Sequence, residues 1–312
     1  MASGFVRGNL HTHSLRSDGT ASIEAMVRWY RDHDYQFLAM TEHNVRVDPA
    51  ELAAQLQPGF VLIPGEEVTN EWKGLPLHVN AICASETIGG GIDFEDPASG
   101  LARVTESIRA AGGIPLVNHP NFGWALDAGD IEKGVSLPFL LEIWSGHPIV
   151  RAGGDPSHPS EEAIWDDVVA RGVPATPVAV DDAHGLAGEP GSGDALPGRG
   201  WVELFGADLT PSSICEALAA GRLYASSGPR LARIQVRGDE LLIVPRDART
   251  TVAFLGEWGE ELALVATADA PATAEGHAVV YRLRGGEITV RARVSDPDGG
   301  HAWTPAYRVL AR

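Results

Sequence analysis

The segment Leu10-His11-Thr12-His13 carries the first residues of this chain that could do chemistry, and Asp18 follows five residues later. Side chains two residues apart on a strand point to the same side, so both imidazoles can face one metal ion. The loop that follows can bring Asp18 back to a neighbouring ion. A lone His-x-His pair is a modest signal, but further His, Asp and Glu residues stand at or near the ends of later apolar runs. Together they predict a metal site.

Nine residues form this candidate site. They are His11, His13, Asp18, His43, Glu67, His78, His119, Asp182 and His184. One transition metal takes about four to six ligands, so nine suit two or three divalent ions that share a bridging carboxylate. Mixed histidine and carboxylate sites accept Mn, Fe or Zn. Such metals lower the pKa of bound water to roughly 7, which supplies a nucleophile without Ser or Cys.

Short apolar runs alternate with amphipathic segments through the first two thirds of the chain. The runs predict strands at residues 5–10, 37–40, 60–63, 77–83, 114–117, 139–144, 177–180 and 201–205. Apolar residues at helical spacing predict helices near 23–30, 101–111, 164–169 and 210–221. This alternation favours parallel pairing, in a β/α barrel or a doubly wound sheet.

The candidate ligands discriminate between these two folds. Almost all of them lie at the C-terminal ends of the runs, and those ends meet at one mouth only in a barrel. His78 fits least well, because it lies early in its run. We therefore expect an irregular barrel over residues 1–228. Residues 229–312 carry short alternating runs between Gly, Asp and Pro turns, which predict a small sandwich-like all-β domain.

Composition limits the partners. The formal net charge is -18, which argues against nucleic acid as a partner, since such binding depends on clustered Lys and Arg. Membrane partners are not expected, because no stretch approaches the roughly 20 apolar residues of a membrane helix. Only two cysteines occur, Cys83 and Cys215, each within an apolar run; they indicate buried structural roles and no disulfide framework. The first eight residues lack the pattern of a signal peptide, so we expect a cytoplasmic protein.

Successive motifs of this chain resemble those of the PHP (polymerase and histidinol phosphatase) family, in the same order, from residue 5 to about 228. They are Leu10-His11-Thr12-His13, Ser17-Asp18-Gly19, Thr41-Glu42-His43-Asn44, Pro64-Gly65-Glu66-Glu67, His78-Val79-Asn80, Asn118-His119-Pro120 and Asp182-Ala183-His184. Residues 201–229 and the terminal 302–307 are similar to the corresponding parts of its CehA/McbA-type metallohydrolases.

The resemblance implies a distorted (β/α)7 TIM-like barrel with a trinuclear centre. It implies a first metal on His11, His13, Glu67 and Asp182, a second that Glu67 bridges to His78 and His119, and a third on Asp18, His43 and His184. Glu42 departs from the usual Asp before this histidine, and we expect it to tune the site. Motif spacing favours Glu67 over Glu66 and Asp182 over Asp181 as ligands.

These residues favour a metal-dependent phosphoesterase acting on a small, anionic phosphate ester. In this interpretation a hydroxide bridging two metals attacks phosphorus, Glu67 bridges the metals, and Asp182 or a histidine such as His184 relays the proton to the leaving group. The same site would also suit a carbamate or carboxylic ester. An apolar mouth, built from Phe122, Trp124 and Trp144, would favour that neutral substrate, whereas a convergent arginine pair would favour phosphate. A non-catalytic metal-binding module is a third hypothesis.

Further residues are candidates for contacts with substrate or with ligands. Arg16, Arg46, Arg151 and Arg199 lie on expected mouth loops, and arginine binds phosphate oxygens well. His147 and His158 lie in loops near the mouth, while His33 is expected on the surface. Glu142 ends a strand, where it would either orient a ligand histidine or make a plain structural contact.

Overall fold

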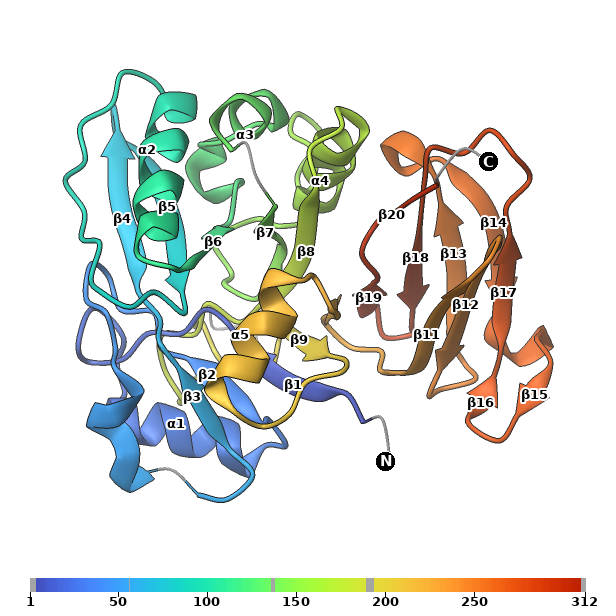
Figure 1. Ribbon diagram of the computed structural model, residues 1–312, viewed down its shortest axis with the longest axis horizontal. Helices are drawn as coiled ribbons and strands as arrows, with labels where there is room; N and C mark the ends of the chain where they lie inside the picture. The colour runs from blue at the N-terminus through green and yellow to red at the C-terminus, as the bar shows by residue number, and fades with distance from the viewer. Residues whose placement is uncertain (1–3, 56, 136–137, 189–193, 310–312) are drawn as a thin grey trace. The chain divides into compact units, whose positions relative to one another are not determined.

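The computed structural model describes the chain except for residues 1–3, 56, 136–137, 189–193 and 310–312. The chain separates into two compact units, Met1–Leu223 and Tyr224–Arg312 (Figure 1). The first unit mixes helices with strands, whereas the second is built mainly of strands. The mixed α/β class expected from the sequence is therefore confirmed.

Two sheets form the frame of the first unit. One has the order β9-β1-β2-β3 and the other the order β4-β5-β6-β7-β8. Their bounds are β1 Val6–Asn9, β2 Phe37–Ala39, β3 Val61–Ile63, β4 Glu67–Trp72, β5 Leu75–Ile82, β6 Ile114–Val117, β7 Phe139–Ser145, β8 Ala175–Val180 and β9 Trp201–Leu204. The pairs β1–β2, β2–β3, β6–β7 and β7–β8 are parallel, and the pairs β1–β9, β4–β5 and β5–β6 are antiparallel.

Isolated bridges join the two sheets beside the predicted ligands. Thr12 pairs with Ala183, and His43 pairs with Glu67, both in parallel orientation. Among the described residues of the first unit the strands form these two ladders and not one closed barrel, so the (β/α)7 barrel remains a prediction. The bridges nevertheless bring the segments that follow β1, β2 and β8 together with the first residue of β4.

Five α-helices accompany these strands among the described residues. They are α1 Ile23–Asp32, α2 Pro97–Ala110, α3 Ala128–Gly134, α4 Glu161–Ala170 and α5 Pro211–Ala219. Most begin with a side chain that accepts a hydrogen bond from the first turn, as Ser22 does from the Ala25 amide. Short 3-10 turns lie at Pro49–Gln55 and Phe122–Trp124. The helix α1 buries Ile23, Met26, Val27 and Tyr30, which is the stripe predicted from their spacing.

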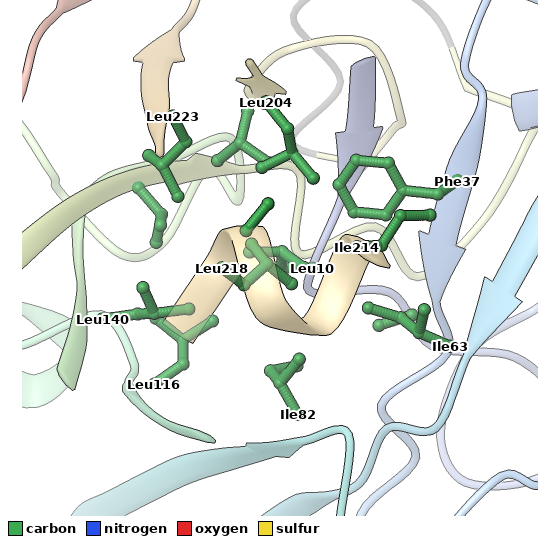
Figure 2. Packing of buried hydrophobic residues seen from close by; sticks show 14 of the residues in the cluster. Leu10, Phe37, Ile63, Ile82, Leu116, Leu140, Leu204, Ile214, Leu218 and Leu223 are labelled. Atoms are coloured by element: carbon green, nitrogen blue, oxygen red, sulfur yellow. The ribbon is translucent and has the colours of Figure 1, made fainter. Parts of the chain in front are cut away.

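Helix α5 lies within the main apolar cluster of the first unit. Figure 2 shows Ile214 and Leu218 among side chains that come from the surrounding strands. Burial of each such aliphatic side chain stabilises the fold by about 1.5–3 kcal/mol. A disulfide between Cys83 and Cys215 ties α5 to the residue after β5. The two cysteines have a structural role, as expected, but they are half-buried and the expectation of no disulfide is wrong, because the fold brings together two residues that lie 132 positions apart in the sequence.

Antiparallel strands make up the second unit. Their bounds are β10 Leu223–Ser226, β11 Leu231–Arg237, β12 Glu240–Pro245, β13 Thr251–Leu255, β14 Glu261–Ala266, β15 Ala272–Thr273, β16 Gly276–His277, β17 Val279–Arg282, β18 Thr289–Ser295, β19 His301–Trp303 and β20 Tyr307–Arg308. One sheet runs β14-β13-β18-β19-β10 and another β11-β12-β17. The rings of Phe254 on β13 and Tyr281 on β17 stack with centroids 5.3 Å apart, so the two sheets meet through their side chains. The sequence-based boundary, after residue 228, lies shortly beyond β10.

No helix in the described ranges combines the length and the apolar character that crossing a membrane requires.

Candidate metal centre

His11 and His13 leave the end of β1 and are fully buried. Their Nε2 atoms lie 3.1 Å apart. Backbone hydrogen bonds hold this segment beside the residues that follow β8: the Asp182 amide donates to the His11 carbonyl and the His13 amide to the Ala183 carbonyl. The fold therefore points both imidazoles at one place, as their spacing predicted.

Glu67 stands at the centre of the cluster, at the start of β4, and is 1% exposed. Its Oε2 lies 3.2 Å from His11 Nε2 and 3.1 Å from His13 Nε2. On the other side, Oε1 accepts a hydrogen bond from Asn118 Nδ2 at 2.8 Å and lies 2.9 Å from His78 Nδ1. Oε2 is buried and has no hydrogen-bond partner among the described residues. An anionic oxygen in this state is suited to a cation.

Asp182 completes an inner group that also contains His11, His13 and Glu67. Its Oδ1 lies 3.3 Å from His11 Nε2, 3.4 Å from His13 Nε2 and 3.7 Å from His184 Nδ1. The backbone of Asp182 adopts a φ of 49°, a left-handed conformation that is unfavourable for a residue other than glycine. Such strain is found mainly where the surrounding structure and function require it.

Asp18, His43 and His184 form an outer group at the rim. Asp18 lies 3.3 Å from His43 Nε2 and 3.4 Å from His184 Nε2 through its two oxygens. Its nearest approach to His13 is 3.6 Å, at Nδ1. The loop after β1 thus brings Asp18 back beside the histidines, as predicted.

His78 and His119 approach Glu67 from β5 and from the end of β6. His119 Nε2 lies 3.5 Å from Glu67 Oε1. Strand β5 runs antiparallel to β6. The N-terminal half of β5, which carries His78, therefore lies at the end of the sheet where the parallel strands finish. The position that fitted the sequence pattern least well is explained by this strand direction.

Glu66 and Asp181, the neighbours of two candidate ligands, face away from the cluster. Glu66 accepts hydrogen bonds from the amides of Ile88 and Gly89 at 2.9 and 2.7 Å. Asp181 accepts from Tyr30 and from Asn9 at 2.8 and 2.7 Å. The structure therefore places Glu67 and Asp182 in the cluster and gives the adjacent acids structural contacts.

Two buried acids hold the histidines in position. Glu142 accepts a hydrogen bond from His11 Nδ1 at 2.7 Å and another from the His119 amide at 2.8 Å. Glu42 accepts hydrogen bonds from the hydroxyls of Ser14 and Ser17, each at 2.5 Å. Ser17 Oγ in turn lies 3.3 Å from His13 Nδ1. Glu142 thus contacts His11 directly, whereas Glu42 is linked to His13 through Ser17.

The histidines and carboxylates of the cluster shift one another's pKa values. Burial alone would lower the pKa of His13, but Asp182 and Glu67 outweigh it and raise this pKa to about 9. The pKa of His11 is also raised well above 6.5, since Asp182, Glu67 and Glu142 outweigh its burial. Burial would raise the pKa of Glu67, yet the nearby His11 and His78 hold it well below its ordinary value. Carboxylates that stay ionised this deep inside a protein need positive charge beside them.

These side chains fall into four overlapping groups. Within each group the ligand atoms lie close enough to one another to bind a single metal ion. The groups are His13–Asp18–His43–His184, His11–His119–Asp182, His11–His13–Glu67 and Glu67–His78–His119. Every one of the nine predicted ligands belongs to at least one group. Glu67 is shared by two groups, which is the position of a bridging carboxylate. The donor set of imidazoles and carboxylates fits divalent Mn, Fe or Zn.

A cavity of about 190 Å³ opens over the cluster. Among the predicted substrate contacts, His147 lines it, with its ring centroid 5.0 Å from that of His184. Burial lowers the pKa of His147 to about 4, so it is neutral at pH 7. Phe122, Ile149 and Val150 add an apolar wall, which the sequence analysis anticipated only for Phe122.

The predicted arginines make other contacts. Arg16 pairs with Glu51 at 2.9 Å, Arg46 donates to the Ala84 carbonyl at 2.8 Å, and Arg199 donates to the Gly146 carbonyl at 3.3 Å. The cavity wall, as far as the structure describes it, includes none of them, nor Arg151. Their role in binding substrate remains a prediction.

No family model matches the chain. A 5'-3' exoribonuclease from Haemophilus influenzae is 24% identical over 200 residues, which are 58% of this chain and 65% of that protein, so the match spans just under two thirds of the relative.

Among solved structures, a two-domain protein from Bacteroides vulgatus containing a predicted PHP-like metal-dependent phosphoesterase aligns with a TM-score of 0.50 and 16% identity, covering 99% of this chain and 95% of that one. A putative metal-dependent phosphoesterase from Bifidobacterium adolescentis aligns with a TM-score of 0.42 and 14% identity, covering 68% of this chain and 95% of that one. An amidohydrolase from Chromobacterium violaceum gives a TM-score of 0.41 and 17% identity, covering 69% and 96%. The chain therefore has a fold similar to that of the Bacteroides vulgatus protein.

Proposed function

We propose that this protein is a metal-dependent hydrolase of small phosphate esters, with two or three divalent ions at the cluster. The observation that carries the proposal is the position of Glu67, a buried carboxylate with one oxygen among His11, His13 and His43 and the other beside His78. A carboxylate shared between two groups of histidines supports adjacent cations better than an isolated ion.

Divalent ions bound there would lower the pKa of water and neutralise the charge that develops on phosphate oxygens. The protein contributes the positions of the groups. Glu142 holds His11 with Nδ1 protonated, so that Nε2 is free to act as a ligand. Thr69 Oγ1, 2.6 Å from His43 Nδ1, orients that ring in the same way. Asp182 and His184, which border the cavity, are the candidates for passing a proton to the leaving group.

The relatives support the phosphate class. The Haemophilus influenzae relative is named as an exoribonuclease, and the Bacteroides vulgatus protein is described as a predicted metal-dependent phosphoesterase. The cavity of about 190 Å³ suits a small reacting group. A net charge of -18 disfavours a long polyanionic chain as substrate, so we propose a small-molecule ester.

The apolar wall favours a second candidate, hydrolysis of a carbamate or carboxylic ester at the same site. Phe122, Ile149 and Val150 would contact a neutral substrate, and no arginine stands in the described lining to bind a phosphate oxygen. The metals themselves must then supply the positive charge if phosphate is the substrate.

Four p-nitrophenyl substrates separate these candidates: a phosphate monoester, a phosphate diester, a carboxylic ester and a carbamate. Because they share a leaving group, the comparison isolates the electrophile. Faster turnover of a phosphate by metal-reconstituted protein, lost in Glu67→Gln, is the expected result. Faster turnover of the ester or carbamate would select the second candidate. Metal binding without any turnover would favour the non-catalytic module.

A further inference from the structure

Two buried asparagines lie beside the cluster, in motifs that supply only their histidines to the candidate site. Asn80 belongs to the motif His78-Val79-Asn80, and Asn118 belongs to the motif Asn118-His119-Pro120. The side chain of Asn80 is fully buried and that of Asn118 is 1% exposed. Buried amide groups need hydrogen-bond partners inside the protein, so the contacts of these two side chains show what they do.

Backbone groups fix the orientation of both side-chain amides. The backbone N–H of Asn80 donates to Asn118 Oδ1 at 3.1 Å, and Asn80 Nδ2 donates to the Leu10 carbonyl at 3.1 Å. A backbone N–H can only donate and a carbonyl can only accept, so neither amide can be turned over without losing its bond. The oxygen of Asn80 consequently faces Asn118 Nδ2, which donates to it at 2.9 Å.

The other N–H of Asn118 Nδ2 points at Glu67. It donates to Glu67 Oε1 at 2.8 Å, and the same oxygen lies 2.9 Å from His78 Nδ1 and 3.5 Å from His119 Nε2. This bond restricts the rotation of the planar carboxylate, so it also places Oε2, which lies 3.1 Å from His13 Nε2. Asn118 therefore determines which oxygen of Glu67 faces which histidines.

Asn118 is a neutral donor, and this matters for a carboxylate that is to bind cations. A Lys or Arg at this position would form an ion pair with Glu67 and compete with a cation for its charge. An amide holds one oxygen in place and leaves the negative charge uncompensated. Among the described residues, Glu67 Oε2 has no hydrogen-bond partner. The carboxylate is thus oriented by Asn118 and still available to cations on both sides.

We propose that Asn118 is a positioning residue that holds Glu67 with one oxygen toward each of two groups of histidines, and that Asn80 fixes the amide of Asn118. This inference rests on the proposed function, which requires adjacent divalent ions at the cluster. Without the donor, Glu67 is free to rotate, and the group Glu67–His78–His119 loses its oriented carboxylate. An ion in that group should then bind more weakly.

The variant Asn118→Leu tests this role, because leucine has a similar branched shape but offers neither a donor nor a ligand atom. Mn²⁺ is the probe. Calorimetric titration gives the number and affinity of the bound ions, and electron paramagnetic resonance detects the magnetic coupling of two Mn²⁺ ions that share a bridge. We expect one ion to bind about 10–100-fold more weakly. The coupled signal should decrease at the Mn²⁺ concentration that fills the wild-type sites.

Asn70→Leu is the matched control. Asn70 is also a buried asparagine that accepts a backbone amide, that of Ile92 at 2.9 Å, so this variant loses the same kind of bond away from the cluster. Its Mn²⁺ affinities should stay within about twofold of wild type. Thermal unfolding with chelator checks the fold of each variant. If Asn118→Leu does not fold, Asn80→Ala keeps the donor to Glu67, removes its support and should weaken the same ion several-fold.

Equal Mn²⁺ affinities in wild type and the folded Asn118→Leu protein would overturn the inference, as would equal losses in Asn118→Leu and Asn70→Leu. Unchanged affinities in Asn80→Ala would overturn it as well. Wild-type protein that hydrolyses phosphate esters with Mn²⁺ but shows no coupled pair would overturn the inference and leave the proposed function intact. A coupled pair that depends on Asn118, in a protein that hydrolyses no ester, would support the inference and overturn the proposed function.

Discussion

Glu142 Oε1 lies 2.7 Å from His11 Nδ1, and both side chains are fully buried. The second oxygen of Glu142 accepts the backbone amide of His119, another candidate ligand. One carboxylate therefore fixes the ring of one histidine and the backbone of a second. The positions of two candidate ligands thus depend on a residue that belongs to none of the four groups that could hold a metal ion.

Replacing Glu142 by Gln should weaken metal binding by about 10–100-fold. The Gln oxygen would accept the His119 amide, so its NH2 group would face His11 Nδ1 and favour the tautomer whose Nε2 carries the proton. Metal titration followed by calorimetry measures the effect. Glu106→Gln, a change at an exposed position of α2, is the matched control. Unchanged metal affinity in Glu142→Gln would show that Glu142 only packs against the site.

Stability of the metal-free protein should fall as pH rises above about 6.5. The pKa of His13 is raised from 6.5 to about 9 by Asp182 and Glu67, which outweigh its burial, so its protonated form stabilises the fold below pH 6.5. That contribution is lost as pH rises through about 9. The pKa values of Glu67 and Asp182 are lowered, so their contributions are present above their ordinary pKa values and are lost in acid.

Metal should reverse the alkaline trend, because ligand histidines must be deprotonated and binding therefore strengthens with pH. Thermal unfolding from pH 6 to 9.5, with chelator and with metal, measures both trends. A metal-free protein that gains stability between pH 6.5 and 9 would contradict the charge arrangement described for His13.

His147→Ala should lower kcat/KM about tenfold and leave the metal content unchanged. Its ring lines the cavity, and burial lowers its pKa to about 4, so it contacts substrate as a neutral hydrogen-bonding group. Steady-state kinetics and elemental analysis of the same preparation check both statements. Loss of an ion in this variant would instead make His147 a ligand.

Cys215→Ser should destabilise the first unit by roughly 2–4 kcal/mol, the usual effect of removing a disulfide. The bond with Cys83 closes a span of 132 residues and ties α5 to the chain after β5. Denaturant unfolding of both forms, with thiol counting by mass spectrometry, gives the measurement. Two free thiols in the native protein would show that the bond is absent. Since disulfides persist mainly in oxidising compartments, the bond does not favour the predicted cytoplasmic location.

The sequence was most informative where one spacing corresponds to one geometry. The His11–His13 pair lies at the end of β1, and the Asp182–His184 pair follows β8, so period-two spacing and strand ends were enough to place both pairs. The apolar stripe of α1 was equally clear.

Other features depend on contacts between distant segments. Strand β4 was missed because Glu67–Trp72 reads as a polar segment, and its pairing with β5 is not visible in either strand alone. The disulfide depends on the approach of α5 to the end of β5.

The most direct test of the central claim is to measure bound metal and phosphate-ester hydrolysis on the same preparations of wild type and Glu67→Gln. We predict two or three divalent ions per wild-type chain, together with turnover. In Glu67→Gln we predict at least one ion fewer and loss of activity, because the buried oxygen beside His11, His13 and His43 loses its charge. A Glu67→Gln protein with full metal content and the wild-type rate would contradict the account.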